Sequence, residues 1–87
     1  MKTYLISYDL MAPGKDYQRL YAELDAFAAR KVLLSQRVFE RVNATAAGLR
    51  DHFRQFIDPS DRLLIVCLTD GDWASWNTIT KINQAVA

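Results

Sequence analysis

The chain opens with alternating apolar and polar positions. In the stretch TYLISYDL, residues 3–10, the side chains of Tyr4, Ile6 and Tyr8 share one side, and Asp9 falls on the opposite side. This two-residue period is typical of a β-strand with one buried face. We therefore expect an opening strand that buries its aromatic side and ends on a carboxylate.

Two later segments carry the three- and four-residue spacing of amphipathic helices. The apolar positions of the first, about four turns long, are Tyr17, Leu20, Tyr21, Leu24, Phe27 and Ala28. In the second they are Leu49, Phe53, Phe56 and Ile57. Asn43 or Thr45 can cap the start of the second helix, and Pro59 ends it because the residue before a proline disfavours helix.

Between and after these helices the pattern predicts three more strands. KVLLSQRVFERV reads as a pair of short strands, at residues 32–35 and 37–42, with a tight bend near Gln36. RLLIVCL is apolar on both faces, as expected for a strand that is covered above and below. One candidate cover is a third helix over 72–86, capped by Asp72, with apolar positions Trp73, Trp76, Ile79, Ile82 and Val86. The other candidate is a second subunit.

The order strand, helix, strand, strand, helix, strand is the ferredoxin-like βαββαβ plan, of the α+β class. It predicts a four-stranded antiparallel sheet with two helices on one face, here followed by a C-terminal helix. At 87 residues the chain forms one domain over 1–87. Its core is expected over 2–68, with the helical extension over 72–86.

Composition and charge restrict the function classes. Eleven Lys and Arg against ten Asp and Glu give a net charge of +1, so any nucleic-acid binding must be local. The longest apolar run is too short to cross a bilayer, and the N-terminus has no signal-peptide core, so no membrane partner is expected. Cys67 is the single cysteine and lies in an apolar run, which excludes an internal disulfide and suits a reducing cytoplasm.

Asp9 is the first candidate for chemistry, because aspartate is a poor strand former. At a strand end it either accepts hydrogen bonds from the following loop or provides a carboxylate for a metal ion or a proton. The pattern alone favours the first interpretation.

Three stretches taken together, YLISYDL, SQRVFER and FIDPSDRLLIV, resemble the landmarks of CRISPR-associated protein two, the small adaptation subunit of CRISPR systems. The resemblance covers residues 2–68 and depends on the order and spacing of the landmarks. It implies a ferredoxin-like homodimer. The same fold and opening Asp occur in virulence-associated protein D toxins and in small relatives outside CRISPR loci.

The resemblance implies a nuclease of antiviral defence that hydrolyses phosphodiesters in RNA or DNA. Asp9 from each subunit would lie near the twofold axis and hold a Mg²⁺ ion, so it is both the catalytic and the metal residue. Two carboxylates with retained waters suit Mg²⁺. The alternative is a non-catalytic dimeric scaffold, because Arg37 occupies the family's serine position and the net charge is close to zero. A small-molecule sensor has no Gly-rich phosphate loop to support it.

Beyond residue 68 the family usually has a short final strand that clasps the other subunit and helps bind the integrase partner. This chain has a Trp-rich segment there instead. The resemblance therefore supports an integrase partner less strongly than it supports the homodimer.

Several cations are candidates for nucleic-acid binding. Arg37 and Arg41 share a strand face with Phe39, and cations with an interleaved aromatic suit nucleic acid, although Phe39 also fits the core. Basic residues of the family lie where this chain has Arg30 and Lys31. On the second helix, Arg50, His52 and Arg54 form either a solvated face or a stripe that follows phosphates.

Overall fold

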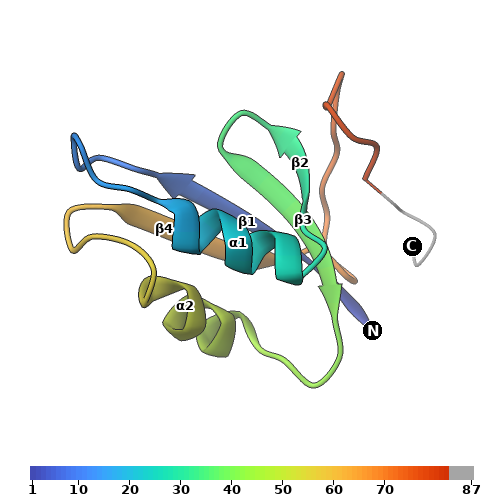
Figure 1. Cartoon of the computed structure of the whole chain (residues 1–87). Coiled ribbons are helices and arrows are strands. Elements are labelled where there is room, and N and C mark those ends of the chain that lie inside the picture. The colour runs from blue at the N-terminus through green and yellow to red at the C-terminus, as the bar shows by residue number, and fades with distance from the viewer. Residues whose placement is uncertain (83–87) are drawn as a thin grey trace.

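The computed structural model describes residues 1–82, and within them the helices and strands all lie between Lys2 and Cys67. Their order is β1 (Lys2–Asp9), α1 (Gln18–Ala26), β2 (Arg30–Leu33), β3 (Gln36–Arg41), α2 (Ala46–Arg54) and β4 (Arg62–Cys67). The strands form one antiparallel sheet in the order β2-β3-β1-β4. Both helices lie on the same face of the sheet (Figure 1). The expected α+β class, sheet and helix layer are confirmed.

The core between the sheet and the helices follows the alternation of β1. Tyr4, Ile6 and Tyr8 are 1%, 0% and 5% exposed, and they pack against α1 and α2. The register places Phe39 of β3 opposite Tyr4, on the same face, and their rings stack with centroids 5.9 Å apart. Because side chains alternate along β1, Asp9 faces away from the helices. This part of the sequence analysis is confirmed.

Helix α1 is shorter than the apolar spacing indicated. The pattern continued through Phe27 and Ala28, whereas the helix ends at Ala26. Ala28 adopts a left-handed conformation with φ of 56°, and the N–H groups of Ala28 and Ala29 donate to the carbonyls of Asp25 and Leu24. These two bonds form a Schellman motif, which satisfies the last carbonyls of the helix and ends it.

The β2–β3 turn and the α2 cap test two local expectations. The turn consists of Leu34 and Ser35, so Gln36 is the first residue of β3 and not the bend itself. The hydroxyl of Thr45 accepts a hydrogen bond from the N–H of Gly48 at 3.0 Å, which confirms Thr45 as the N-cap of α2.

The segment after β4 covers part of the other sheet face without forming a helix. Trp73 and Ile82 pack against the strands on this face, and Trp76 is 91% exposed. The hydrogen bonds of the segment include those from Trp73 Nε1 to the carbonyl of Leu68 at 3.1 Å and from Ile79 N–H to the carbonyl of Val32 at 2.8 Å. The expected helix is therefore wrong for residues 72–82, and its remainder, including Val86, lies outside the described residues.

Candidate functional site

Asp9 lies at the end of β1 on the sheet face that the helices leave open. Its side chain is 61% exposed, and Oδ2 lies 3.8 Å from the guanidinium of Arg62, its register neighbour on β4. Next to this pair on the same face, Leu64 is 58% exposed opposite Ser7. The part of the C-terminal segment that packs on this face does so against Leu5 and its neighbours and leaves Asp9 exposed.

Asp9 provides one exposed carboxylate for a metal ion, next to the guanidinium of Arg62. Among residues 1–82, no group of three or more His, Cys, Asp or Glu side chains is arranged to hold a metal ion. Mg²⁺ is commonly held by one or two carboxylates and several waters. A second copy of the chain would raise the number of carboxylates to two, whereas the positive charge of Arg62 next to each Asp9 disfavours a cation.

The arginines of β3 face the helix layer. Arg37 is only 15% exposed at its side chain, donates to Asp25 Oδ1 at 3.0 Å and lies over the ring of Tyr21. Although burial acts to lower the pKa of Arg37, hydrogen bonds with Tyr8 and Asp25 raise it above its ordinary value. Arg37 therefore has a defined structural role under α1.

Arg41, on the same strand, lies with its guanidinium carbon 3.9 Å from the centroid of the Phe27 ring. Phe39 between the two arginines is 2% exposed, in agreement with its core interpretation. Arg30 and Lys31 are exposed on β2, the sheet edge opposite to β4. Arg37 and Lys31 are paired in register across β2 and β3.

The three candidate residues of α2, Arg50, His52 and Arg54, separate into two groups. Arg50 and Arg54 line a cleft beside β4. His52 instead turns to α1, where its ring packs against Phe27 and its Nε2 lies 3.7 Å from Glu23. The continuous stripe that includes His52 is therefore wrong, while Arg50 and Arg54 stay together.

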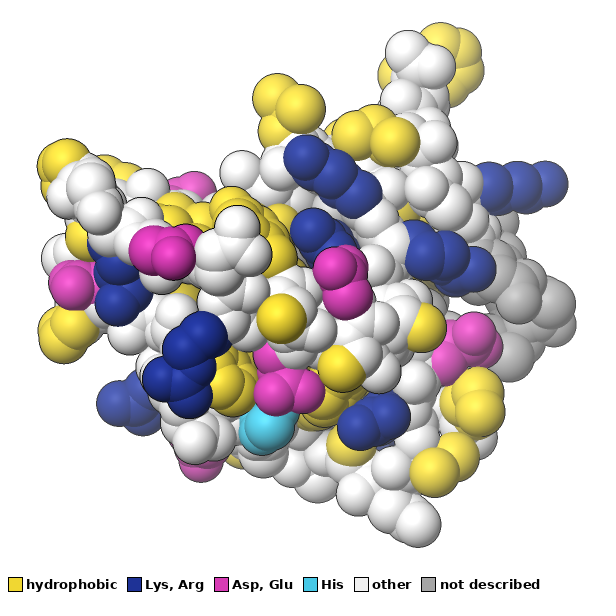
Figure 2. Space-filling view, viewed as in Figure 1, with side chains coloured by type: hydrophobic (Ala, Val, Ile, Leu, Met, Phe, Trp, Pro, Cys, Tyr) yellow, Lys and Arg dark blue, Asp and Glu magenta, His cyan; other side chains and the backbone are white. Residues whose placement is uncertain are grey.

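Viewed from the side of the helices, Lys and Arg side chains are interspersed with Asp and Glu, as Figure 2 shows. This distribution agrees with the net charge of +1. On this face of the described residues, the cations therefore form no broad basic surface.

Asp61, which was not among the residues predicted from the sequence, organises the loops next to Asp9. Its carboxylate accepts hydrogen bonds from Met11 N–H at 2.6 Å, Tyr17 O–H at 2.8 Å and Asp58 N–H at 2.7 Å. Burial acts to raise the pKa of Asp61, but these donors lower it below its ordinary value. Arg62 was also missed, because only the strand pairing brings it to Asp9.

No protein-family model matches the chain, and no solved structure gives a significant match to it. Among residues 1–82, no helix has the length and apolar character needed to cross a membrane.

Proposed function

We propose that the chain forms a ferredoxin-like homodimer that acts as a metal-dependent phosphodiesterase on RNA or DNA. The observation that carries the proposal is the exposure of Asp9 at the end of β1, on the face opposite the helices. The strand order β2-β3-β1-β4 is compatible with a ferredoxin-like sheet. This fold supports the family resemblance of the three sequence landmarks.

In this proposal two copies meet through the open sheet face. Leu64 offers exposed apolar surface there, adjacent to Ser7 and Asp9 in the register. In a twofold-symmetric dimer the same surface of each copy forms the interface, so the Asp9 of one copy is brought toward the Asp9 of the other. An 87-residue chain also gains buried apolar area by dimerising.

Each residue of the site has a role in the cleavage. Asp9 of both protomers would hold a Mg²⁺ ion, which, when bound, supplies an activated water and neutralises charge on the phosphate. Arg62 can donate hydrogen bonds to a phosphate oxygen next to Asp9 and orient the strand. Arg30, Lys31, Arg50 and Arg54 would bind phosphates farther along the strand.

The Asp9→Asn variant tests the proposal. We expect Mg²⁺-dependent cleavage of labelled single-stranded RNA and DNA to fall by about 100-fold or more, since a neutral amide holds a cation poorly. The melting temperature should stay unchanged, because Asp9 is exposed and its single ion pair is long. Asp72→Asn, which removes another exposed carboxylate, is the matched control and should retain full activity.

Equal cleavage by wild type and Asp9→Asn would reject the nuclease proposal, as would a monomer in light scattering at assay concentration. The second candidate is a non-catalytic dimeric scaffold, which is favoured by Arg37, because this residue occupies the family's serine position and is held under α1 by Asp25. A dimer without turnover by the wild-type protein would support the scaffold.

A further inference from the structure

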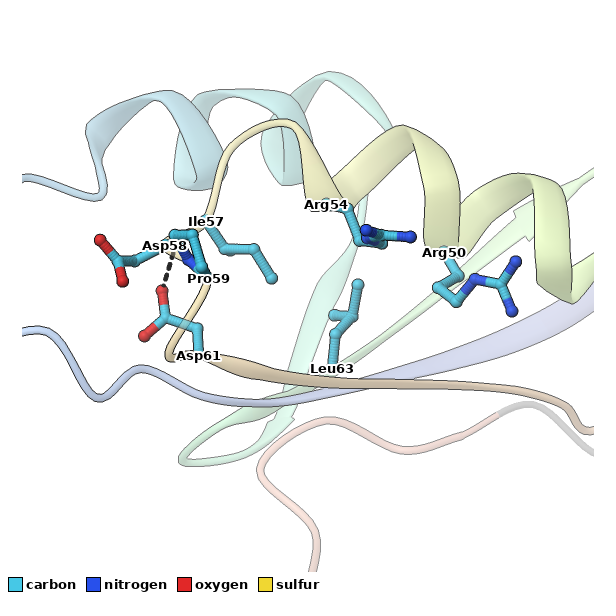
Figure 3. A pocket seen from close by; sticks show the side chains of 7 residues that line it. All are labelled: Arg50, Arg54, Ile57, Asp58, Pro59, Asp61 and Leu63. Carbon is cyan, nitrogen blue, oxygen red and sulfur yellow. Dashed lines mark hydrogen bonds between the residues drawn. The ribbon is translucent and has the colours of Figure 1, made fainter.

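An open cleft of about 680 Å³ lies between α2 and the start of β4. It is lined by Arg50, Arg54, Ile57, Asp58, Pro59, Asp61 and Leu63. Figure 3 shows that these residues come from α2, from the linker between α2 and β4, and from the start of β4. The cleft lies on the helix side of β4, whereas Asp9 lies on the opposite side of the sheet.

One end of the cleft is cationic. Arg50 and Arg54 are one helical turn apart and extend from the same side of α2 (Figure 3). Their side chains are 51% and 67% exposed, and they share Asp51 as an acidic neighbour, at 3.0 Å and 3.8 Å. One carboxylate cannot engage all the N–H donors of two guanidinium groups. The remaining donors are available to an anionic ligand.

The middle of the cleft is apolar, and its other end is acidic. Ile57 and Leu63 point toward each other across the space between the linker and β4 (Figure 3). At the far end Asp61 is engaged by three donors, and hydrogen bonds from Ser60 lower the pKa of Asp58. Both carboxylates therefore stay charged near neutral pH and repel an anion at that end.

We propose that this cleft binds one nucleotide unit, with its phosphate between Arg50 and Arg54 and its base or sugar on Ile57 and Leu63. The charge gradient allows a phosphate at one end only, so the ligand has a single orientation. A base reaches the apolar floor only when it is unstacked, which restricts the ligand to a free nucleotide or to a single strand. A free nucleotide and a single strand have the nucleoside monophosphate unit in common, and this unit is the proposed ligand.

The inference extends the proposed function, because Arg62 lies between Asp61 and Leu63 in the sequence and reaches Asp9 on the open face. A strand that leaves the cleft across the β4 edge would pass Arg62 and arrive at Asp9. Nucleotide binding itself requires neither Asp9 nor a metal ion. The two proposals can therefore fail separately.

The experiment uses Asp9→Asn protein in EDTA, so that no cleavage interferes. Binding of AMP, of inorganic phosphate and of a ten-nucleotide single-stranded RNA is measured by calorimetry, and ¹⁵N amide shifts locate the ligand. Arg50→Gln/Arg54→Gln is compared with Lys2→Gln/Lys81→Gln, which removes the same charge from exposed positions elsewhere. Circular dichroism confirms that both variants fold.

We expect the arginine double variant to bind RNA at least about tenfold more weakly, and the lysine double variant to bind as its parent does. The slope of log K against log salt should fall by about 0.7 in the arginine variant, because the two side chains hold one phosphate of the strand. Amide shifts should concentrate in α2 and at the start of β4. Binding of AMP identifies a free nucleotide as ligand, and saturation by RNA alone identifies a strand.

Equal affinity of the two double variants would overturn the inference, as would inorganic phosphate binding as tightly as both AMP and RNA. Binding by an acidic peptide in place of all nucleotides would also overturn it. If the wild-type protein shows no cleavage but the arginine-dependent binding is found, only the nuclease proposal fails. If cleavage depends on Asp9 but the two double variants bind RNA and AMP equally well, only the cleft proposal fails.

Discussion

The carboxylate of Asp61 joins three segments that are far apart in the sequence. It accepts hydrogen bonds from the loop after β1, from Tyr17 before α1 and from the linker after α2. These segments surround the end of β1, where Asp9 lies. Asp61 is therefore expected to fix the shape of the loops on which the candidate site depends.

Replacing Asp61 by Asn should destabilise the protein. The amide keeps one acceptor oxygen, but its NH₂ group must face an N–H donor such as that of Asp58 or Met11. We expect a loss of about 1–2 kcal/mol at pH 7, which for a chain of this size lowers the melting temperature by about 4–8 °C for each kcal/mol. Asp72→Asn is the control, and an equal melting temperature for both variants would contradict the role of Asp61.

The same residue predicts an acid-dependent loss of stability. The folded-state pKa of Asp61 lies below its unfolded value, which is about 3.9. Its contribution is therefore fully present above the unfolded value and disappears as the pH falls through the folded-state value. Chemical denaturation between pH 7 and pH 2 should show the difference between wild type and Asp61→Asn shrinking below about pH 4. A constant difference over this range would contradict the prediction.

Residues whose environment depends on local alternation could be predicted from the sequence. The burial of Tyr8 and Phe39 and the outward direction of Asp9 follow from the two-residue period. The role of Asp61 could not, because its partners Tyr17 and Met11 are 44 and 50 positions away. The nearly buried position of Arg37 could not be predicted from the sequence either, because it depends on contact with Asp25 in α1.

At the scale of elements, helix α1 ends on an unfavourable residue. The Schellman motif needs a left-handed residue, a conformation in which glycine avoids the steric cost of a Cβ atom. Ala28 occupies it with φ of 56°. The chain therefore retains backbone strain at this helix end.

Ala28→Gly should stabilise the protein by about 0.5–1 kcal/mol, because removal of the strain exceeds the added entropy of the unfolded chain. Thermal unfolding would show this as a higher melting temperature. The control is Ala22→Gly inside α1, which should destabilise by about 1 kcal/mol at a helical position. A lower melting temperature for Ala28→Gly would contradict the assignment.

The start of α2 was predicted correctly and the end of α1 was not, because only the first is marked by a local sequence signal. An N-cap is a local signal, and Thr45 provides a hydroxyl acceptor for Gly48 N–H. The end of α1 carries no glycine, and the apolar spacing runs on through Phe27 and Ala28. Those side chains belong to the turn that follows and not to another helical turn.

At the scale of the whole molecule, the two sheet faces are covered in different ways. One carries both helices over a continuous core, and the other carries residues 68–82, which form no helix or strand, over Leu5, Val38 and Val66. The spacing of Trp73 and Trp76 matched a helix, but Asp70 and Asn77 adopt left-handed backbone, with φ of 62° and 54°. A helix cannot continue through Asn77 in that conformation.

The two tryptophans should respond differently to truncation. Trp73 packs on the sheet and donates a hydrogen bond to the Leu68 carbonyl, so Trp73→Ala should cost about 3 kcal/mol. Trp76 is 91% exposed, and Trp76→Ala should change stability by less than about 0.5 kcal/mol. Urea denaturation of the two variants measures the difference. Equal losses would show that Trp76 also contributes to the packed cover.

The fastening of this segment has a practical consequence for any shortened form of the protein. Hydrogen bonds at Trp73 and Ile79 hold it, and Ile82 completes its apolar contacts with the sheet. A chain cut just after Thr69 would keep the helices and strands that the structure describes, but it would expose apolar side chains of the sheet, such as Leu5 and Val38, to water. Such a protein should precipitate on concentration, although its far-ultraviolet spectrum would look native.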